Sequence, residues 1–111
     1  MKQREEKLFL EDILLFCEHI TEYLEGVDKT SFLANRMLQD ALVRKIEIIG
    51  EAVKNISIGT REKYPDIPWK EIAGMRDKVI HHYFRVDLDV VWKTSTVFVP
   101  KLKIEIEKIL G

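Results

Sequence analysis

The sequence has little of what marks a small secreted or fibrous protein. Among its 111 residues are one cysteine, three prolines and five glycines. A single cysteine excludes an intrachain disulfide and a zinc site with several cysteine ligands. The low glycine and proline content, together with 46% hydrophobic residues, excludes collagen-like and disordered chains. We therefore expect one folded domain over residues 1–111, small enough that burial against a second copy is a real option.

An excess of charge of one sign is also missing. The 18 basic and 19 acidic residues give a net charge of −1 and a pI of about 6.3. Domains that bind nucleic acid through bulk charge are typically strongly basic, so only a local basic site remains open. The apolar run at residues 13–16 is too short for a signal sequence or a membrane span. We expect a cytoplasmic protein that does not associate with membranes.

Apolar residues at three- and four-residue spacing predict helices over most of the chain. The first stripe runs from Phe9 to Leu24, and Gly26 is a suitable stop after it. Cys17 falls among its apolar residues, so we expect a buried hydrophobic side chain rather than a nucleophile. A second stripe runs from Leu38 to Ile56, behind the possible caps Thr30 and Ser31, and ends at residues 57–59.

The rest of the chain predicts shorter helical segments and then one long helix. Thr60 is a possible cap of a short helix before the break at residues 64–66. A third helix is expected to begin at residues 66–69 and to continue through Ile72, Met75 and Val79 toward Phe84. The fourth is expected to begin at Asp87. Its β-branched first half would permit a strand, but no partner strand is apparent, so we expect a helix with a kink at Pro100. The predicted fold is an all-α, up-and-down bundle of four to five helices.

Residues 75–87 contain the side chains with the most evident chemistry. Arg76, His81, His82 and Tyr83 lie close together in a segment, residues 60–85, with six basic and four acidic side chains. Arginine binds phosphate oxygens, and histidine transfers protons near neutral pH. Such a set suits cleavage of a phosphodiester without a metal, through a base acting on a ribose 2′-OH, an acid acting on the leaving oxygen and a cation on the phosphate.

Helix geometry limits this interpretation. On a straight helix His81 would lie about 140° from Arg76 but next to Asp77, four residues before it. Arg76 and His81 would converge only through the reach of the arginine, a local distortion or a second copy of the chain. Asp77 either orients His81 or forms an ordinary surface pair with it. From the residues alone, an active site and an ordinary helix surface both remain open.

The other histidines have weaker claims to a catalytic role. His82 suits a supporting or surface position, and His19, alone in the first helical segment, suits a structural or exposed one. On a helix the adjacent His81 and His82 would point to different sides, unlike the pair four residues apart in a helical zinc site. We therefore expect no metal.

The motif and its surroundings resemble one protein family. Arg76, four residues, His81, one residue and Tyr83 match the Arg-x4-His-x-Tyr motif of HEPN-domain ribonucleases, most closely the HepT-like toxin branch. Residues 48–55, with the sequence IIGEAVKN, and residues 67–77, with the sequence IPWKEIAGMRD, resemble the segments that accompany this motif. Val86 and Asp87, followed by an apolar helix, also fit, so the likeness covers nearly the whole chain.

The resemblance implies a HEPN-like helical bundle that forms a homodimer in which two motifs face a shared cleft. It implies a metal-independent endoribonuclease that needs no cofactor and leaves a 2′,3′-cyclic phosphate and a 5′-hydroxyl. By position, Arg76 would stabilise the scissile phosphate and His81 would be the acid or base. Asp77 would orient the catalytic pair or set the local backbone. His82 adds a second candidate proton carrier.

Tyr83 carries a further implication of the resemblance. In the HepT-like branch the toxin is silenced by a minimal nucleotidyltransferase antitoxin, which adenylylates the motif tyrosine, and Tyr83 matches that position. An AMP group there would put phosphate where RNA should bind. Packing alone remains an alternative role for Tyr83. Two other functions stay open: a non-catalytic HEPN module that binds nucleotide or RNA and partners a nucleotidyltransferase, and a plain helical dimerisation domain.

Overall fold

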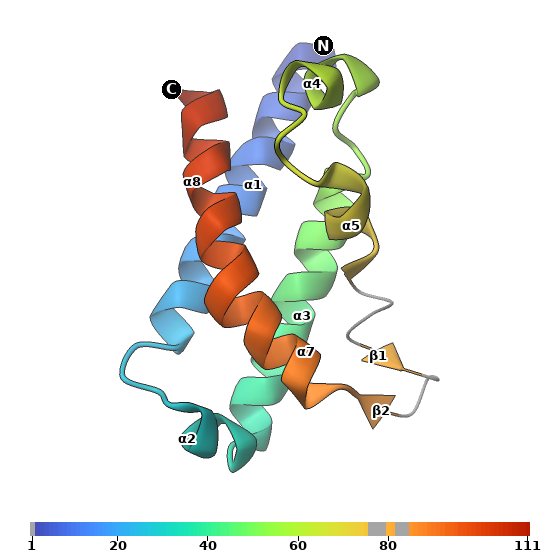
Figure 1. Cartoon of the computed structure of the whole chain (residues 1–111). Helices are drawn as coiled ribbons and strands as arrows, with labels where there is room; N and C mark the ends of the chain where they lie inside the picture. Colours follow the sequence, from blue (N-terminus) through green and yellow to red (C-terminus); the bar gives the residue numbers. More distant parts are fainter. Residues whose placement is uncertain (1, 76–79, 82–84) are drawn as a thin grey trace.

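A computed structural model describes the backbone of residues 2–75, 80–81 and 85–111, and the side chains of residues 6–75 and 86–111 (Figure 1). The elements, in chain order, are α1 (Lys2–Tyr23), α2 (Lys29–Leu33), α3 (Arg36–Val53), α4 (Ile58–Lys63), α5 (Trp69–Ala73), β1 (Ile80–His81), β2 (Arg85–Val86), α7 (Leu88–Lys93), the π-helical turn η1 (Thr94–Phe98) and α8 (Val99–Leu110).

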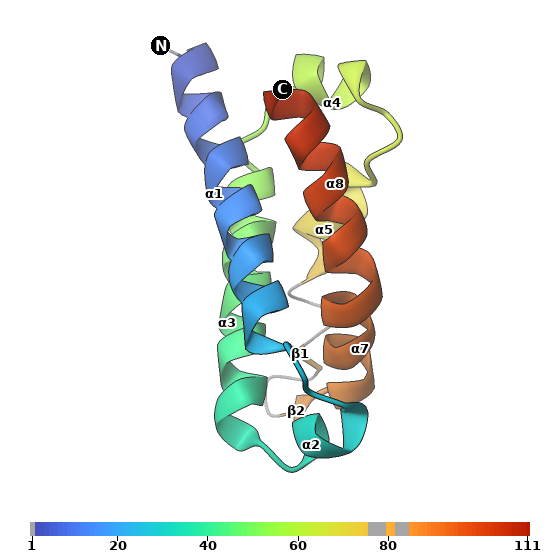
Figure 2. The same ribbon diagram turned by 90° about the vertical axis from the view of Figure 1, so that its left-hand side faces the viewer.

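The prediction of an all-α, up-and-down bundle is confirmed. α1 and α3 run in opposite directions, and α7, η1 and α8 together form a third long rod, with α5 as a short descending helix (Figure 1). Figure 2 shows α8 beside α1, which also packs along α3. In the part of the chain that the structure describes, no helix is long and apolar enough to cross a membrane.

The apolar stripes predicted from the sequence form the core. Side chains from the three rods meet there without solvent contact: Ile13, Cys17 and Ile20 from α1, Leu42, Ile46, Ile49 and Val53 from α3, and Val91, Val99 and Ile106 from the third rod. Burial raises the pKa of the Cys17 thiol to about 12. The thiol therefore stays protonated at neutral pH, and the prediction that Cys17 is a buried hydrophobic residue is confirmed.

The segment that was expected to form one second helix forms two separate helices, α2 and α3. Asp28, rather than Thr30 or Ser31, caps α2 by accepting a hydrogen bond of 2.8 Å from the backbone N–H of Ser31. Asn35 then starts α3 in the same way, with a bond of 3.0 Å from Leu38. The amide of Gln39 donates to the carbonyl of Phe32, at 2.9 Å, and so caps the end of α2. Asn35 competes locally with a continuous helix because its side chain satisfies the backbone N–H groups of a new helix start.

The short helix before Tyr64 exists, but Ser57 rather than Thr60 caps it. The Ser57 hydroxyl accepts from the backbone N–H of Thr60 at 3.1 Å. Glu6 of α1 accepts hydrogen bonds from the backbone N–H of Ser57 and from the Thr60 hydroxyl. Burial tends to raise the pKa of Glu6, but these hydrogen bonds outweigh it and leave the pKa below its usual range. This carboxylate therefore ties the start of α1 to the start of α4.

The last helix begins as predicted and departs from regular geometry just before Pro100. Asp87 caps α7 by accepting from the backbone N–H of Val90 at 3.2 Å. A kink was expected at Pro100 itself; the structure has the π-helical turn η1 directly before α8, and Pro100 lies in the first turn of α8. A proline has no N–H to donate, and its ring crowds the carbonyl four residues earlier, here that of Thr96. A wider π turn accommodates such a crowded carbonyl.

The prediction of a helix continuing toward Phe84 is wrong for the described residues. α5 ends at Ala73, with Gly74 as its C-cap, and Ile80–His81 is extended. β1 pairs antiparallel with β2, with Ile80 opposite Val86 and His81 opposite Arg85. Glycine favours a helix end, and aromatic and β-branched residues favour extended backbone. The sequence between 80 and 86 is rich in such residues.

α5 reaches α3 at a glycine. A Cβ atom on the buried Gly50 would lie 3.4 Å from the carbonyl oxygen of Ile72 and 3.5 Å from that of Ala73. The two helix backbones are therefore so close that a methyl group would just fit and a branched side chain would not. The end of α5 thus lies directly against α3.

We predict that Gly50→Val lowers the free energy of unfolding by about 1–3 kcal/mol because it overpacks this contact. Gly50→Ala should stay within about 1 kcal/mol of wild type, since alanine has the higher helix propensity and its methyl group fits. Urea denaturation followed by circular dichroism measures both. Equal stability of the two variants would show that α5 does not need the close approach.

Candidate active site

The predicted catalytic residues lie between α5 and α7. Arg76, Asp77 and Tyr83, and also His82, are outside the residues that the structure describes. Of His81 only the backbone is described, in β1. In the chain, α5 leads into the motif segment and α7 follows it.

The strand pair changes the geometry expected for His81. Because His81 is on a strand opposite Arg85, the separation of about 140° from Arg76 that a straight helix would impose does not apply. Only three residues, Tyr83 among them, connect the two strands. The backbone of His81 is thus placed by a ladder within the motif segment rather than by a helix face.

The segment before the motif is anchored by buried apolar side chains. Trp69, Ile72 and Met75 are at most 5% exposed and belong to the core, and α5 packs against α3. The indole N–H of Trp69 donates to the carbonyl of Tyr64 at 3.0 Å, which satisfies the one polar atom of this large side chain. In the sequence the motif begins directly after the buried Met75.

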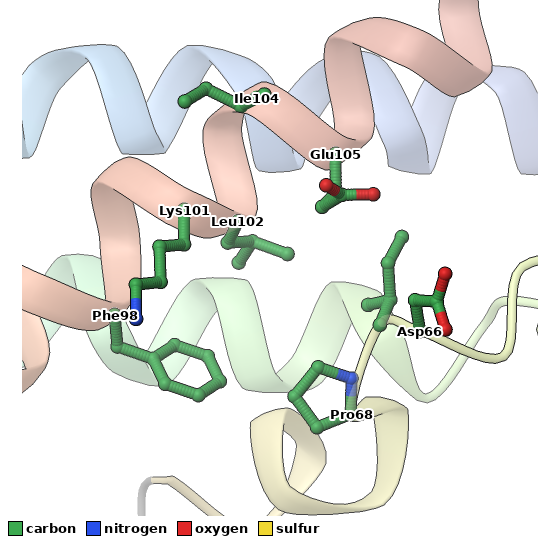
Figure 3. A pocket seen from close by; sticks show the side chains of 8 residues that line it. Asp66, Pro68, Phe98, Lys101, Leu102, Ile104 and Glu105 are labelled. Atoms are coloured by element: carbon green, nitrogen blue, oxygen red, sulfur yellow. The ribbon is translucent and has the colours of Figure 1, made fainter.

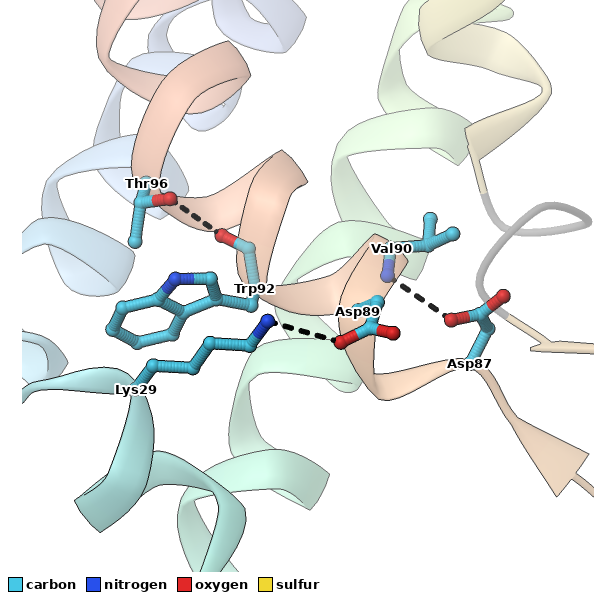
Figure 4. Close-up of polar contacts among 6 residues, drawn as sticks. All are labelled: Lys29, Asp87, Asp89, Val90, Trp92 and Thr96. Carbon is cyan, nitrogen blue, oxygen red and sulfur yellow. Dashed lines mark hydrogen bonds and ion pairs between the residues drawn. The ribbon is translucent and has the colours of Figure 1, made fainter.

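The segment after the motif is anchored by α7 (Figure 4). Asp87 caps this helix. Trp92 packs against Phe32 of α2 with 5.2 Å between the ring centroids. Lys29 forms an ion pair of 3.2 Å with Asp89. The two charged side chains are 51% and 81% exposed, so water screens this pair and it contributes little to stability. The buried Phe32 ring and its partner Trp92 form the stronger link between α2 and α7.

His19 has surroundings that fit its expected structural role. Its ring lies between Phe16 and Tyr23, with centroid separations of 5.9 and 6.3 Å. It belongs to α1, whereas the motif lies between α5 and α7. Within the described ranges, no three His, Cys, Asp or Glu side chains converge as metal ligands would.

Several residues that position the site escaped sequence reasoning. The contact of Gly50 with α5 and the Phe32–Trp92 pair both join segments far apart in the chain. A glycine inside a long helical stripe was an available signal, because it lowers helix propensity and often marks a close approach. No local sequence pattern predicts the contact between Phe32 and Trp92.

Comparison with known proteins confirms the resemblance to HepT-like ribonucleases. The model of the family described as Ribonuclease HepT-like matches residues 13–109. A protein of Methanocaldococcus jannaschii named "Putative RNase MJ0125" is 47% identical over 99% of this chain and 95% of its own length. "Probable ribonuclease HepT" of Thermococcus cleftensis is 45% identical over 96% of this chain and 97% of its own.

A third relative, "Putative RNase TTE0752" of Caldanaerobacter subterraneus, is 46% identical over 92% of this chain and 91% of its own length. No solved structure matches the chain. The family model and these nearly full-length relatives show that this chain belongs to the HepT-like ribonuclease family.

Proposed function

We propose that this protein is a metal-independent endoribonuclease and the toxin of a toxin–antitoxin pair. The observation that carries the proposal is the intact Arg76-x4-His81-x-Tyr83 motif inside the region matched by a ribonuclease family model. The names of the relatives support action on RNA. Cellular RNA as substrate also implies action in the cytoplasm.

The proposed chemistry is transesterification within the RNA strand. The 2′-oxygen attacks the neighbouring phosphorus while a base takes its proton, and the bond from phosphorus to the 5′-oxygen breaks as an acid protonates that oxygen. The products are a 2′,3′-cyclic phosphate and a 5′-hydroxyl. Arg76 stabilises the charge that builds on the phosphate oxygens, and His81 transfers a proton. Asp77 orients this pair.

Each motif supplies one histidine, His81, as the proposed acid or base, whereas the reaction needs both an acid and a base. We propose that a homodimer supplies the second, with two motifs facing one cleft, and that His82 is the alternative second carrier. In the chain the strand pair lies between α5 and α7, both of which contact α3.

Replacing His81 by alanine should lower the rate of RNA cleavage by about 10²–10⁴-fold, since it removes the proton transfer. Arg76→Ala should cost about 10²–10³-fold, since it removes the charge that stabilises the transition state. Cleavage of mixed cellular RNA in EDTA by purified protein measures both. Arg36→Ala, exposed at the start of α3, is the matched control and should cleave like wild type.

Circular dichroism must show that each variant is folded. Cleavage by His81→Ala at the wild-type rate would refute the assignment, and loss of wild-type cleavage in EDTA would refute the metal-free mechanism. Folded wild-type protein that cleaves no RNA would favour a non-catalytic module that binds RNA or nucleotide.

We further propose that a nucleotidyltransferase antitoxin silences the enzyme by adenylylating Tyr83. Tyr83→Phe should accept no AMP, because it lacks the phenolic oxygen, and should stay toxic when the antitoxin is present. Intact-mass spectrometry after incubation with the antitoxin and ATP measures the transfer. Tyr23→Phe, a partly exposed tyrosine on α1, is the control and should be modified like wild type. Transfer of AMP to Tyr83→Phe would show that another residue is the acceptor.

A further inference from the structure

A cavity of about 280 Å³ lies between α8 and the loop that leads into α5 (Figure 3). Its walls are mainly apolar: Ile67 and Leu102 are buried, and Ile104 is 53% exposed beside it. Drug-sized ligands occupy cavities of roughly 300–1,000 Å³, so this one suits a smaller group, about the size of a single planar ring system.

The cavity has an aromatic wall. The ring of Phe98, from the end of the π-helical turn η1, borders it together with Pro68 (Figure 3). Phe98 is only partly buried, so the ring contributes to the cavity surface as well as to the core. Aromatic side chains of this kind stack with the unpaired bases of single-stranded RNA, and every base has a face that can stack.

Two carboxylates border the same cavity. Glu105 comes from α8 and Asp66 from the loop before α5 (Figure 3). Carboxylates repel a phosphate but accept hydrogen bonds from the N–H groups on the edge of a base. Glu105 also pairs with Lys108 at 3.2 Å, through one of its two oxygens. Since a carboxylate has about four acceptor sites, Glu105 can accept further hydrogen bonds.

One cation borders the cavity. Lys101 is exposed and lies on the side of Phe98 (Figure 3). Within the described residues it has no ion-pair partner. A lysine at the edge of a stacking site commonly binds the backbone phosphate of a nucleic acid strand. Glu105 could therefore bind a base inside the cavity, while Lys101 could bind the adjoining phosphate at its edge.

The cavity lies close to the motif. Pro68 borders it and directly precedes α5, a helix of five residues. At 1.5 Å per residue, α5 spans about 7.5 Å, and the motif segment follows its other end. The cavity and the described residue that directly precedes the motif, Met75, are therefore separated by little more than the length of α5.

We propose that this cavity is a nucleobase subsite for single-stranded RNA. One base stacks on Phe98, its edge donates hydrogen bonds to Glu105, and an adjoining phosphate pairs with Lys101. The Glu105 carboxylate favours guanine, whose adjacent ring N–H and amino group can both donate to one carboxylate. The inference rests on the proposed function, in that RNA is the substrate.

Binding of short labelled RNA oligonucleotides tests the subsite. We would use 2′-fluoro uridine hexamers with no substitution, one guanine or one adenine, which lack the attacking hydroxyl, and measure affinity by fluorescence anisotropy. Phe98→Ala should weaken binding of every oligonucleotide by about 5- to 150-fold, as expected for the loss of one stacked base. Phe98→Trp should restore it.

Glu105→Gln should reduce the preference for guanine over adenine by at least about fivefold and should weaken binding of the uridine hexamer less, since uracil has a single N–H donor on its edge. Glu107→Gln is the matched control: it is exposed on the same helix, does not border the cavity and should bind like wild type. Glu105 is not in the core, so this variant keeps the test decisive even where Phe98→Ala folds poorly.

Wild-type affinities in both Phe98→Ala and Glu105→Gln, or no binding of any oligonucleotide by wild type, would overturn the subsite. Its failure is distinguishable from failure of the proposed function because this assay needs no cleavage. Base-selective binding by a protein that cleaves no RNA would leave the subsite and refute the ribonuclease. Normal cleavage with no effect of either substitution would refute the subsite alone.

Discussion

The arrangement around the candidate active site depends on one helix, α3, because both flanks of the motif pack against it. α5, which leads into the motif, approaches α3 at Gly50 until two of its carbonyl oxygens lie 3.4 and 3.5 Å from the position of a Cβ atom. α7, which leads out of the motif, also contacts α3 and carries the buried Val91. The ends of the motif segment are therefore held relative to each other by a shared support. Chemistry that needs a cation and an imidazole at one phosphate requires this kind of fixed placement.

Apolar burial, rather than surface charge, supplies most of this rigidity. Trp69, Ile72 and Met75 hold the entry to the motif, and burying such side chains stabilises a fold by roughly 1.5–3 kcal/mol each. The Lys29–Asp89 pair at the exit is largely exposed, and such pairs contribute between about 0 and 1 kcal/mol. A fold that is stabilised by apolar burial rather than by surface ion pairs suits a protein that binds a negatively charged RNA strand on its surface.

The sequence predicted the features that local chemistry determines and missed those that need distant contacts. Helical periodicity located the three rods and the buried Cys17, and the short polar side chain of Asp87 announced the start of α7. The split between α2 and α3 was missed because Asn35 resembles an ordinary polar residue within a helical stripe. The ladder of Ile80–His81 with Arg85–Val86 was missed because two-residue strands leave no alternating pattern to detect. The motif was identified by its spacing. Phe98 and Glu105, which border the proposed subsite, looked like members of a helix stripe until the fold set them beside residues 66–68.

The chemistry of the cut ends tests the central claim most directly, because attack by the 2′-oxygen and metal-assisted hydrolysis leave different products. An RNA oligonucleotide would be incubated with the purified protein in EDTA, and mass spectrometry would identify the fragments. The same oligonucleotide with a single 2′-deoxynucleotide on the 5′ side of the cleaved bond is the control. The account predicts a 2′,3′-cyclic phosphate paired with a 5′-hydroxyl, and no cut at the deoxynucleotide. A 5′-phosphate paired with a 3′-hydroxyl, or cleavage that persists at the deoxynucleotide, would contradict it.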